Sequence, residues 1–141
     1  MRCLLVLVLL CSLCCSKPAT REQLPYVQLR VEGRAGEVAW DELTGSWTPA
    51  TQHLEIDAQG YDSERFFLQL DGITGTGPVY LTGNGRFGYS DGVGFTASGV
   101  RAEAVRITRY GPELIEGEFR IVFGNGADSV RTSGTFGIRL P

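Results

Sequence analysis

Residues 117–140 read GEFRIVFGNGADSVRTSGTFGIRL, and this stretch decides the fold class. Phe119, Ile121 and Phe123 occupy every second position, and the same period returns at residues 136–140. Such alternation is typical of an antiparallel strand with one buried and one solvated face. Asn125-Gly126 lies between the two runs and is the strongest short signal for a β-hairpin. The stretch therefore predicts two antiparallel strands joined by a tight turn.

The two predicted strands also share a pattern, because residues 117–121 (GEFRI) resemble residues 134–138 (GTFGI). The likeness has two interpretations. It could be an internal repeat, or it could mark neighbouring strands in which a glycine admits a large ring from the adjacent strand. We favour the second interpretation.

The same two-residue period extends toward the N-terminus, at residues 27–31, 54–58, 66–70 and 105–107. Turn signals separate these runs at Asp71-Gly72, Gly83-Asn84-Gly85 and 110–112. We expect the 83–85 turn to join a strand at 79–81 to one around 87–89. No stretch shows a helical stripe. The pattern predicts an all-β fold, a single antiparallel β-sandwich of about eight to ten strands.

A calycin-like β-barrel is the alternative architecture. Gly45-Ser46-Trp47 echoes the Gly-x-Trp motif that opens the barrel of lipocalins and avidins. In this chain the motif follows two predicted strands instead of opening the first one, so Trp47 fits a core or rim position better. A barrel would hold a small apolar ligand.

Composition bounds the possible partners of the chain. Its 141 residues carry 13 basic and 16 acidic side chains, for a net charge of −3. The sequence has no basic run, so nucleic acid is not an expected partner. Hydrophobic residues make up 43% of the chain and charged residues 21%, as in ordinary globular domains.

All four cysteines, Cys3, Cys11, Cys14 and Cys15, lie within the first fifteen residues. The apolar run from Leu4 to Leu10 is too short to span a membrane, which takes about 20 residues, but it suits a signal peptide. A disulfide framework or a metal site would need downstream cysteine or histidine partners, and the sequence offers none in suitable spacing.

The cysteine cluster resembles a bacterial lipoprotein box, in which a cysteine receives diacylglycerol and becomes the mature N-terminus. On that resemblance Cys15 is the expected lipidation site and Cys14 the alternative. The expected organisation is a signal peptide at 1–14, a polar tether at 15–23 and an antiparallel β domain at 24–141. We expect the protein in the bacterial cell envelope, on an outer-membrane or periplasmic face. Ordinary cleavage after Ser16, followed by secretion, is the alternative.

A second resemblance comes from residues 105–110 (VRITRY), 116–119 (EGEF) and 133–136 (SGTF). Together they are similar to a group of uncharacterised bacterial lipoproteins that pair an I-T-x-Y strand with two G-x-F strands. The likeness covers the last forty residues well. It implies a lipid anchor and a β fold, and it carries over no activity.

The candidates for catalysis and metal binding are few. His53 is the single histidine and begins a predicted strand, where a surface position is expected. Glu116 and Glu118 share one wet face, and Asp41-Glu42 is expected in a loop; solvated charges explain both pairs. Turn formation likewise explains the two sets of oxygen-bearing residues that could be calcium ligands, Asn125 with Asp128 and residues 62–64. We expect no enzyme, no cofactor and no metal.

The remaining candidates are aromatic residues that could form a sugar-binding platform: Trp40, Tyr61, Phe67, Tyr80, Tyr89 and Tyr110. The sequence thus favours a non-catalytic envelope protein with a protein or polysaccharide partner. A calycin-like carrier of an apolar ligand comes second, and a secreted hydrolase third.

Overall fold

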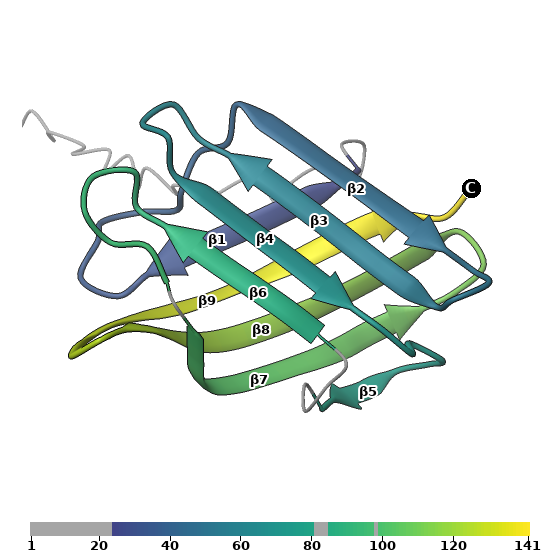
Figure 1. Cartoon of the computed structure of the whole chain (residues 1–141). Coiled ribbons are helices and arrows are strands. Elements are labelled where there is room, and N and C mark those ends of the chain that lie inside the picture. Colours follow the sequence, from purple (N-terminus) through teal and green to yellow (C-terminus); the bar gives the residue numbers. More distant parts are fainter. Residues whose placement is uncertain (1–23, 81–84, 98) are drawn as a thin grey trace, which may run out of the picture.

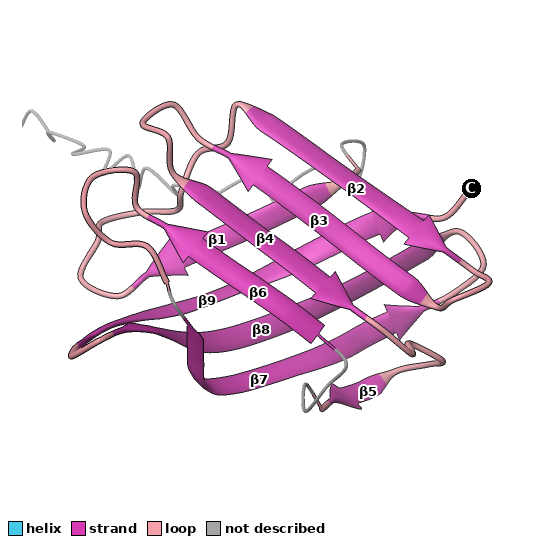
Figure 2. Ribbon diagram, viewed as in Figure 1, coloured by secondary structure: helices cyan, strands magenta, loops and turns pink. Residues whose placement is uncertain are grey.

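The computed structural model describes residues 24–80, 85–97 and 99–141, and in these ranges the chain forms nine strands and no helix (Figure 2). The signal peptide, both lipidation candidates and the tether therefore lie outside the described residues. The all-β prediction is confirmed.

The strands form two antiparallel sheets that pack face to face as a sandwich (Figure 1). Sheet A has the order β1 (Tyr26–Val31), β9 (Asp128–Arg139), β8 (Leu114–Asn125), β7 (Gly99–Tyr110) and β5 (Gly77–Val79). Sheet B has the order β2 (Glu42–Thr48), β3 (His53–Gln59), β4 (Arg65–Leu70) and β6 (Gly85–Ser90). The two sheets stay separate, so the barrel alternative is wrong.

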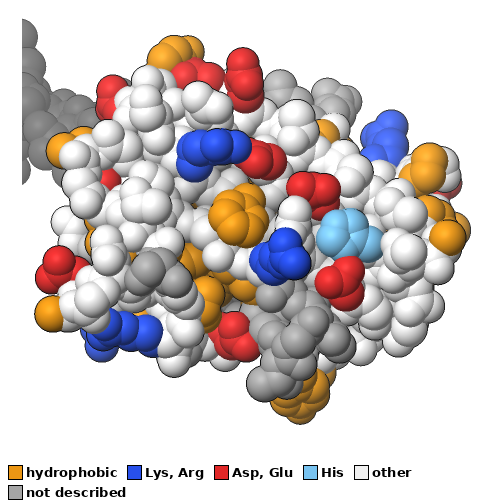
Figure 3. Space-filling view, in the orientation of Figure 1, with side chains coloured by type: hydrophobic (Ala, Val, Ile, Leu, Met, Phe, Trp, Pro, Cys, Tyr) orange, Lys and Arg blue, Asp and Glu red, His pale blue; other side chains and the backbone are white. Residues whose placement is uncertain are grey.

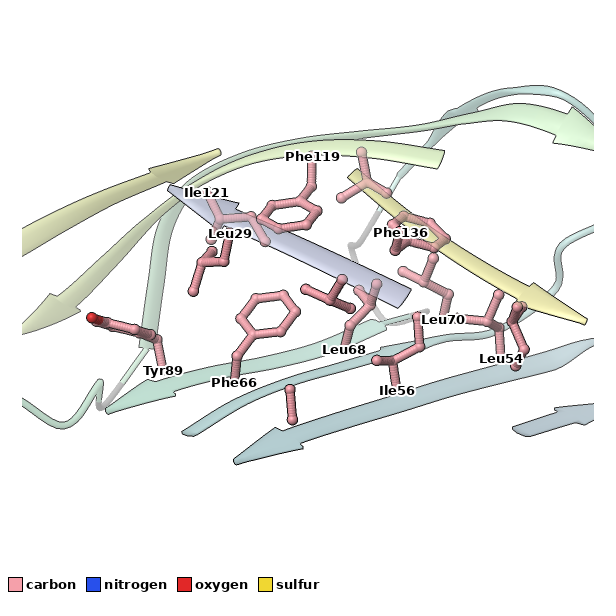
Figure 4. Close-up of a cluster of buried hydrophobic side chains, with 14 of the residues drawn as sticks. Leu29, Leu54, Ile56, Phe66, Leu68, Leu70, Tyr89, Phe119, Ile121 and Phe136 are labelled. Atoms are coloured by element: carbon pink, nitrogen blue, oxygen red, sulfur yellow. The ribbon is translucent and has the colours of Figure 1, made fainter. Parts of the chain in front are cut away.

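The core lies between the sheets and is built from the predicted dry faces (Figure 4). The alternating residues of β3, β4 and β8 are buried as expected, and Phe66 of sheet B stacks on Phe119 of sheet A with ring centroids 5.1 Å apart. The fully buried large side chains are Phe66, Phe119, Phe123, Phe136, Leu29, Leu54, Ile56, Leu68, Leu70, Ile107, Ile115 and Ile121. Burying one such side chain contributes roughly 1.5–3 kcal/mol, so this layer fixes the register of both sheets.

The likeness between residues 117–121 and 134–138 has the explanation that we favoured. β8 and β9 are neighbours, and their register places Gly117 opposite Phe136 and Phe119 opposite Gly134. A Cβ atom added to Gly117 would collide with the Phe136 ring, and one added to Gly134 would lie 2.7 Å from Cζ of Phe119. Each glycine therefore makes room for the other strand's ring.

The hairpin between β8 and β9 forms as predicted, but one residue later than the Asn-Gly signal. Asn125 still pairs with Asp128, so the two-residue loop is Gly126-Ala127. Gly126 takes φ +60°, and Ala127 is not among the residues with positive φ. That combination suits a type II′ turn, which needs glycine at its first central position.

The hairpin predicted around residues 83–85 is wrong. β5 pairs with β7 in sheet A, whereas β6 pairs with β4 in sheet B. The connection between them therefore crosses from one sheet to the other, and its residues 81–84 lie outside the described part. Turn-forming residues such as Gly-Asn-Gly suit a hairpin within one sheet as well as a crossing between two sheets. The burial of β6 against β4 decides for the crossing.

The sandwich has two distinct ends (Figure 1). The connections at residues 32–37, 60–64 and 91–97 and the 126–127 turn gather at one end, which we call the loop end. β1 begins away from the loop end, with Tyr26 opposite Gly137 near the end of β9, and the preceding Pro25 packs against Gly45 of β2. The described domain is thus entered at one end, and its longer loops lie at the other.

Candidate functional site

The outer face of sheet A carries a concentration of arginines. The register places the side chains of β1, β9 and β8 alternately toward the core and toward solvent. In β7 the alternation is shifted twice, between Val100 and Ala102 and between Ile107 and Arg109, so that both Arg106 and Arg109 lie on the outer face.

In the described strands, six exposed arginines project from this outer face, and we call them the arginine face: Arg30, Arg106, Arg109, Arg120, Arg131 and Arg139. Glu116 and Glu118 project outward among them, and a further arginine, Arg101, lies over Gly124 near the β8–β9 turn. The face is therefore basic although the whole chain is acidic.

The arginine face is hollowed toward the loop end. One row across four strands runs from Arg30 through Ser133 and Arg120 to Ala104, so small residues alternate with arginines. The row helps to line an open hollow of about 940 Å³. Arg34 and Arg131 also border this hollow, together with two acidic residues, Glu32 and Glu103. Arg30 and Arg120 are two strands apart, roughly 10 Å at the backbone. That spacing lets an extended ligand contact both guanidinium groups.

Two of the arginines that line the hollow form only exposed ion pairs. Arg30 lies 3.1 Å from Glu37 and Arg131 lies 3.1 Å from Glu32, and both arginine side chains are about 70% exposed. Exposed ion pairs of this kind contribute about 0–1 kcal/mol, so an anionic ligand can displace them. Within the described ranges Arg120, at the centre of the row, has no ion-pair partner.

A buried ionic cluster closes the loop end of the sandwich. Glu64 is buried at the start of β4, and Nη1 of Arg34 donates to both of its carboxylate oxygens, at 2.8 and 2.7 Å. The hydroxyl of buried Tyr89 donates to the same carboxylate at 2.7 Å. Burial and the neighbouring Glu64 carboxylate raise the pKa of Tyr89, and the bond to Glu64 raises the pKa of Arg34. The cluster is satisfied, as a buried charge requires, and it ties the β1–β2 loop to sheet B.

A second set of polar contacts orders the neighbouring β6–β7 connection. One carboxylate oxygen of Asp91 accepts backbone N–H bonds from Val93, Gly94 and Phe95, at 2.8–2.9 Å. These donors favour the ionised form and hold the pKa of Asp91 below its ordinary value. Val93 is 89% exposed at the tip of this loop. The arrangement satisfies itself and accounts for the shape of the loop.

The outer face of sheet B has a different charge pattern (Figure 3). Glu42, Glu55 and Asp57 border a hollow of about 410 Å³ over β2 and β3, and Arg65 lies 3.2 Å from Asp57. Glu42 is the first residue of β2, so the expectation of a loop at Asp41-Glu42 is wrong at that residue. Glu55 accepts a bond from Gln69 at 2.9 Å, which makes this carboxylate part of a cross-strand pair.

The residues that the sequence suggested for catalysis or metal binding do not lie together at one site. His53 begins β3 and is 27% exposed, with Nδ1 2.5 Å from an Asp71 oxygen. Glu116 lies 3.7 Å from Arg109. Asn125 and Asp128 flank the β8–β9 turn, and residues 62–64 belong to the β3–β4 loop. Within the described residues no group of three or more His, Cys, Asp or Glu side chains is arranged to hold a metal ion.

The aromatic candidates likewise do not form a continuous platform. Tyr61 is 86% exposed on the β3–β4 loop and Tyr80 is 76% exposed after β5, whereas Phe67 lies on β4 over the glycine at position 88. Tyr89 is buried, and Trp40 donates from Nε1 to the backbone oxygen of residue 27. Trp47 packs edge-on against Tyr110 at the rim of the core, with ring centroids 6.4 Å apart.

The arginine face is the feature that sequence reasoning missed. Its members lie far apart in the chain, from residue 30 to residue 139, so no local run shows them. A signal was nevertheless present: Arg30, Arg106, Arg120 and Arg139 all occupy solvated positions of the predicted alternating strands. The order of the strands was the missing information, because it decides which solvated positions share a face.

No helix in the described part of the chain is long and apolar enough to cross a bilayer. Comparison of the chain with protein-family models, with curated proteins and with solved structures found no match.

Proposed function

We propose that this protein is a non-catalytic, lipid-anchored protein of the bacterial cell envelope whose arginine face binds an anionic polysaccharide. The observation that carries the proposal is the row of Arg30, Ser133 and Arg120 across β1, β9 and β8. Guanidinium groups form paired hydrogen bonds with carboxylates and phosphates, and the serine hydroxyl can bond to sugar oxygens.

The shape of the site supports a polymer over a small ligand. The hollow is open, and it lies on a sheet face whose other arginines continue toward the opposite end. An extended chain with regularly spaced negative charges could therefore contact several arginines at once. A ligand that contacts several arginines at once binds with an affinity that a single exposed arginine does not supply.

The position of the site supports an anchored role. The cysteine cluster motivates an anchor before residue 24, and β1 begins away from the loop end, with Tyr26 opposite Gly137. The hollow lies toward the loop end. On this proposal the tether holds the domain at a membrane while the hollow faces the surrounding polymer.

The test compares two double variants that remove equal charge. Arg30→Ala/Arg120→Ala removes one paired and one unpaired arginine from the arginine face. Arg65→Ala/Arg86→Ala does the same on the outer face of sheet B, since Arg65 is paired with Asp57 and Arg86 has no ion pair among the described residues. Binding to polygalacturonate and to neutral dextran is measured over a range of salt concentrations.

We expect salt-sensitive binding to polygalacturonate and none to dextran. The first variant should lose about tenfold in affinity for each arginine, the value of one charged hydrogen bond, while the second binds like the wild type. Equal losses in both variants would contradict a role for the arginine face. Tighter binding to duplex DNA, or to vesicles of anionic lipid, would replace the proposed ligand by nucleic acid or by the membrane.

A further inference from the structure

Three of the four sheet edges are protected against pairing with another strand. Along β1, the N–H of Val38 donates to Leu29 at 2.9 Å, and Trp40 donates to Val27 at 3.0 Å. Along β6, the N–H of Ala97 donates to the backbone oxygen of residue 89 at 2.9 Å. β5 is only three residues long and contains a proline, and β7, which in the described part it covers only at residues 105–107, carries an irregularity on either side of that stretch. Short strands, prolines and covering segments are the usual means of blocking an edge.

Within the described residues the fourth edge, β2, has no such protection along its backbone, although Pro25 packs against Gly45 on the core side of the strand. Its seven residues pair with β3 on one side, and within the described residues no backbone hydrogen bond reaches it from the other. The strand contains no proline and no basic residue, and its one charge, Glu42, lies at its first position. A strand of this kind is a template for another strand.

The sequence of β2, ELTGSWT, is symmetric in character about Gly45. Leu43 and Trp47 lie two residues to either side, and Thr44 and Ser46 lie one residue to either side. We propose that β2 pairs with β2 of a second copy of this chain, antiparallel and centred on Gly45. In that register Leu43 faces Trp47 of the second copy, and Thr44 faces Ser46 of the second copy.

The chemistry of both faces fits this register. Leu43 and Trp47 lie on the core side of β2, opposite Ala58 and Leu54, and both are only partly buried in one copy. Pairing covers the rest of each against the other. On the outer side the facing hydroxyls of Thr44 and Ser46 can bond across the strands, as such pairs do in antiparallel sheets.

Electrostatic repulsion does not oppose the pairing. Glu42 would face Thr48 of the second copy, so no like charges stand opposite one another along the edge. The nearest acidic pair, Glu55 and Asp57, lies on β3. Three strand spacings, about 14 Å, would separate these carboxylates from those of the second copy, which exceeds the screening length of about 8 Å at physiological salt. The product is a continuous eight-stranded sheet with two-fold symmetry.

Two variants with changes at the same positions test both the pairing and its register. Thr44→Lys/Ser46→Lys places lysines opposite Asp57 and Glu55 of the same chain, which β3 tolerates, but opposite each other between copies. Thr44→Lys/Ser46→Glu instead places opposite charges across the proposed interface. Its Ser46→Glu change also puts a carboxylate opposite Glu55 of the same chain, so the thermal unfolding of this variant is needed to show that it is folded. The full-length protein, extracted from membranes in detergent, is examined by native mass spectrometry, and its thermal unfolding is followed in parallel.

We expect dimers for the wild type and for the lysine–glutamate variant, and folded monomers for the double-lysine variant. The melting temperature of the double-lysine variant should not depend on protein concentration and should match that of the wild type diluted until it is monomeric. A monomeric wild type at the highest attainable concentration would overturn the proposal. So would a dimeric double-lysine variant, which would show that another surface joins the copies, or a monomeric lysine–glutamate variant, which would exclude the register. None of these outcomes bears on the arginine face.

Discussion

At the scale of single residues, Glu64 shows how the chain accommodates a charge in its interior. A lone carboxylate buried beside the core would be destabilising by several kcal/mol. Arg34 and Tyr89 supply three hydrogen bonds to it, and the three residues come from separate parts of the chain. The cluster therefore fixes the β1–β2 loop against both β4 and β6. The stabilisation that the cluster gives to the fold depends on which of its side chains are ionised.

We predict that Tyr89→Phe destabilises the domain by about 1–3 kcal/mol at neutral pH, the value of a hydrogen bond to a charged group. Because the folded state raises the pKa of Tyr89, its phenol stays protonated in the fold at a pH where the unfolded chain loses the proton. The wild type's advantage should be constant between neutral pH and about pH 10, the ordinary phenol pKa, and shrink above it. Urea unfolding across this range checks the prediction.

Tyr80→Phe is the matched control, because it makes the same chemical change at a 76% exposed site and should leave stability unchanged. A difference between wild type and Tyr89→Phe that stays constant well above pH 10 would contradict the assignment.

At the scale of elements, β8 and β9 are held together by complementary shape as much as by their backbone ladder. Each strand presents a ring where its neighbour has a glycine, at Phe119 with Gly134 and at Phe136 with Gly117. Tyr26 of β1 covers Gly137 of β9 in the same manner. Aromatic cover of strand glycines is a recognised way to pin register, and here it acts across three consecutive strands.

We predict that Gly134→Ala destabilises the domain by at least about 2 kcal/mol, because the added methyl would collide with the backbone oxygen of Gln28, which cannot rotate away. Gly99→Ala, in β7 of the same sheet, has open space around the new Cβ and should stay within about 0.5 kcal/mol of the wild type. Thermal unfolding of both variants measures the difference. Equal stability would mean that β9 shifts freely against β1, contrary to the fixed register described above.

At the scale of the whole molecule, the two faces and the two ends differ. The outer face of sheet A is rich in arginine, whereas the outer face of sheet B carries the hollow bordered by Glu42, Glu55 and Asp57. The loop end is closed by the ionic cluster, and β1 begins away from it, with Tyr26 opposite Gly137 of β9. A molecule with this polarity suits attachment at one end and contact along one side.

We predict that the protein extracted from membranes has the mass of residues 15–141 plus acyl chains, because Cys15 is the expected acceptor of the lipid. Cys15→Ser should release the protein from the membrane fraction, while Cys14→Ser should not. Intact-mass analysis checks both the site and the modification. An unmodified chain that begins at Lys17 would contradict the anchor, and lipid retained by Cys15→Ser would move it to Cys14.

The sequence by itself determined the element type and the core. Alternation at residues 54–58, 66–70 and 119–123 identified the buried side chains because a two-residue period leaves one face for the interior. The similar motifs at Gly117 and Gly134 also predicted that their two strands are neighbours, because a glycine in a strand leaves room for a large ring from the adjacent strand.

Only the tertiary structure decided which strands share a sheet. Sheet membership in turn decides which side chains lie on the same surface. The Asn-Gly signal at residues 83–85 could not reveal that β5 and β6 belong to different sheets, because a turn signal reports local backbone freedom and not the burial of the strands beside it. For the same reason, the sequence indicated only a turn residue at Glu64 and only scattered charges at the six arginines. Strand order is a global property, set by how all the apolar faces are buried together, and it alone brought Arg30 and Arg120 onto one face.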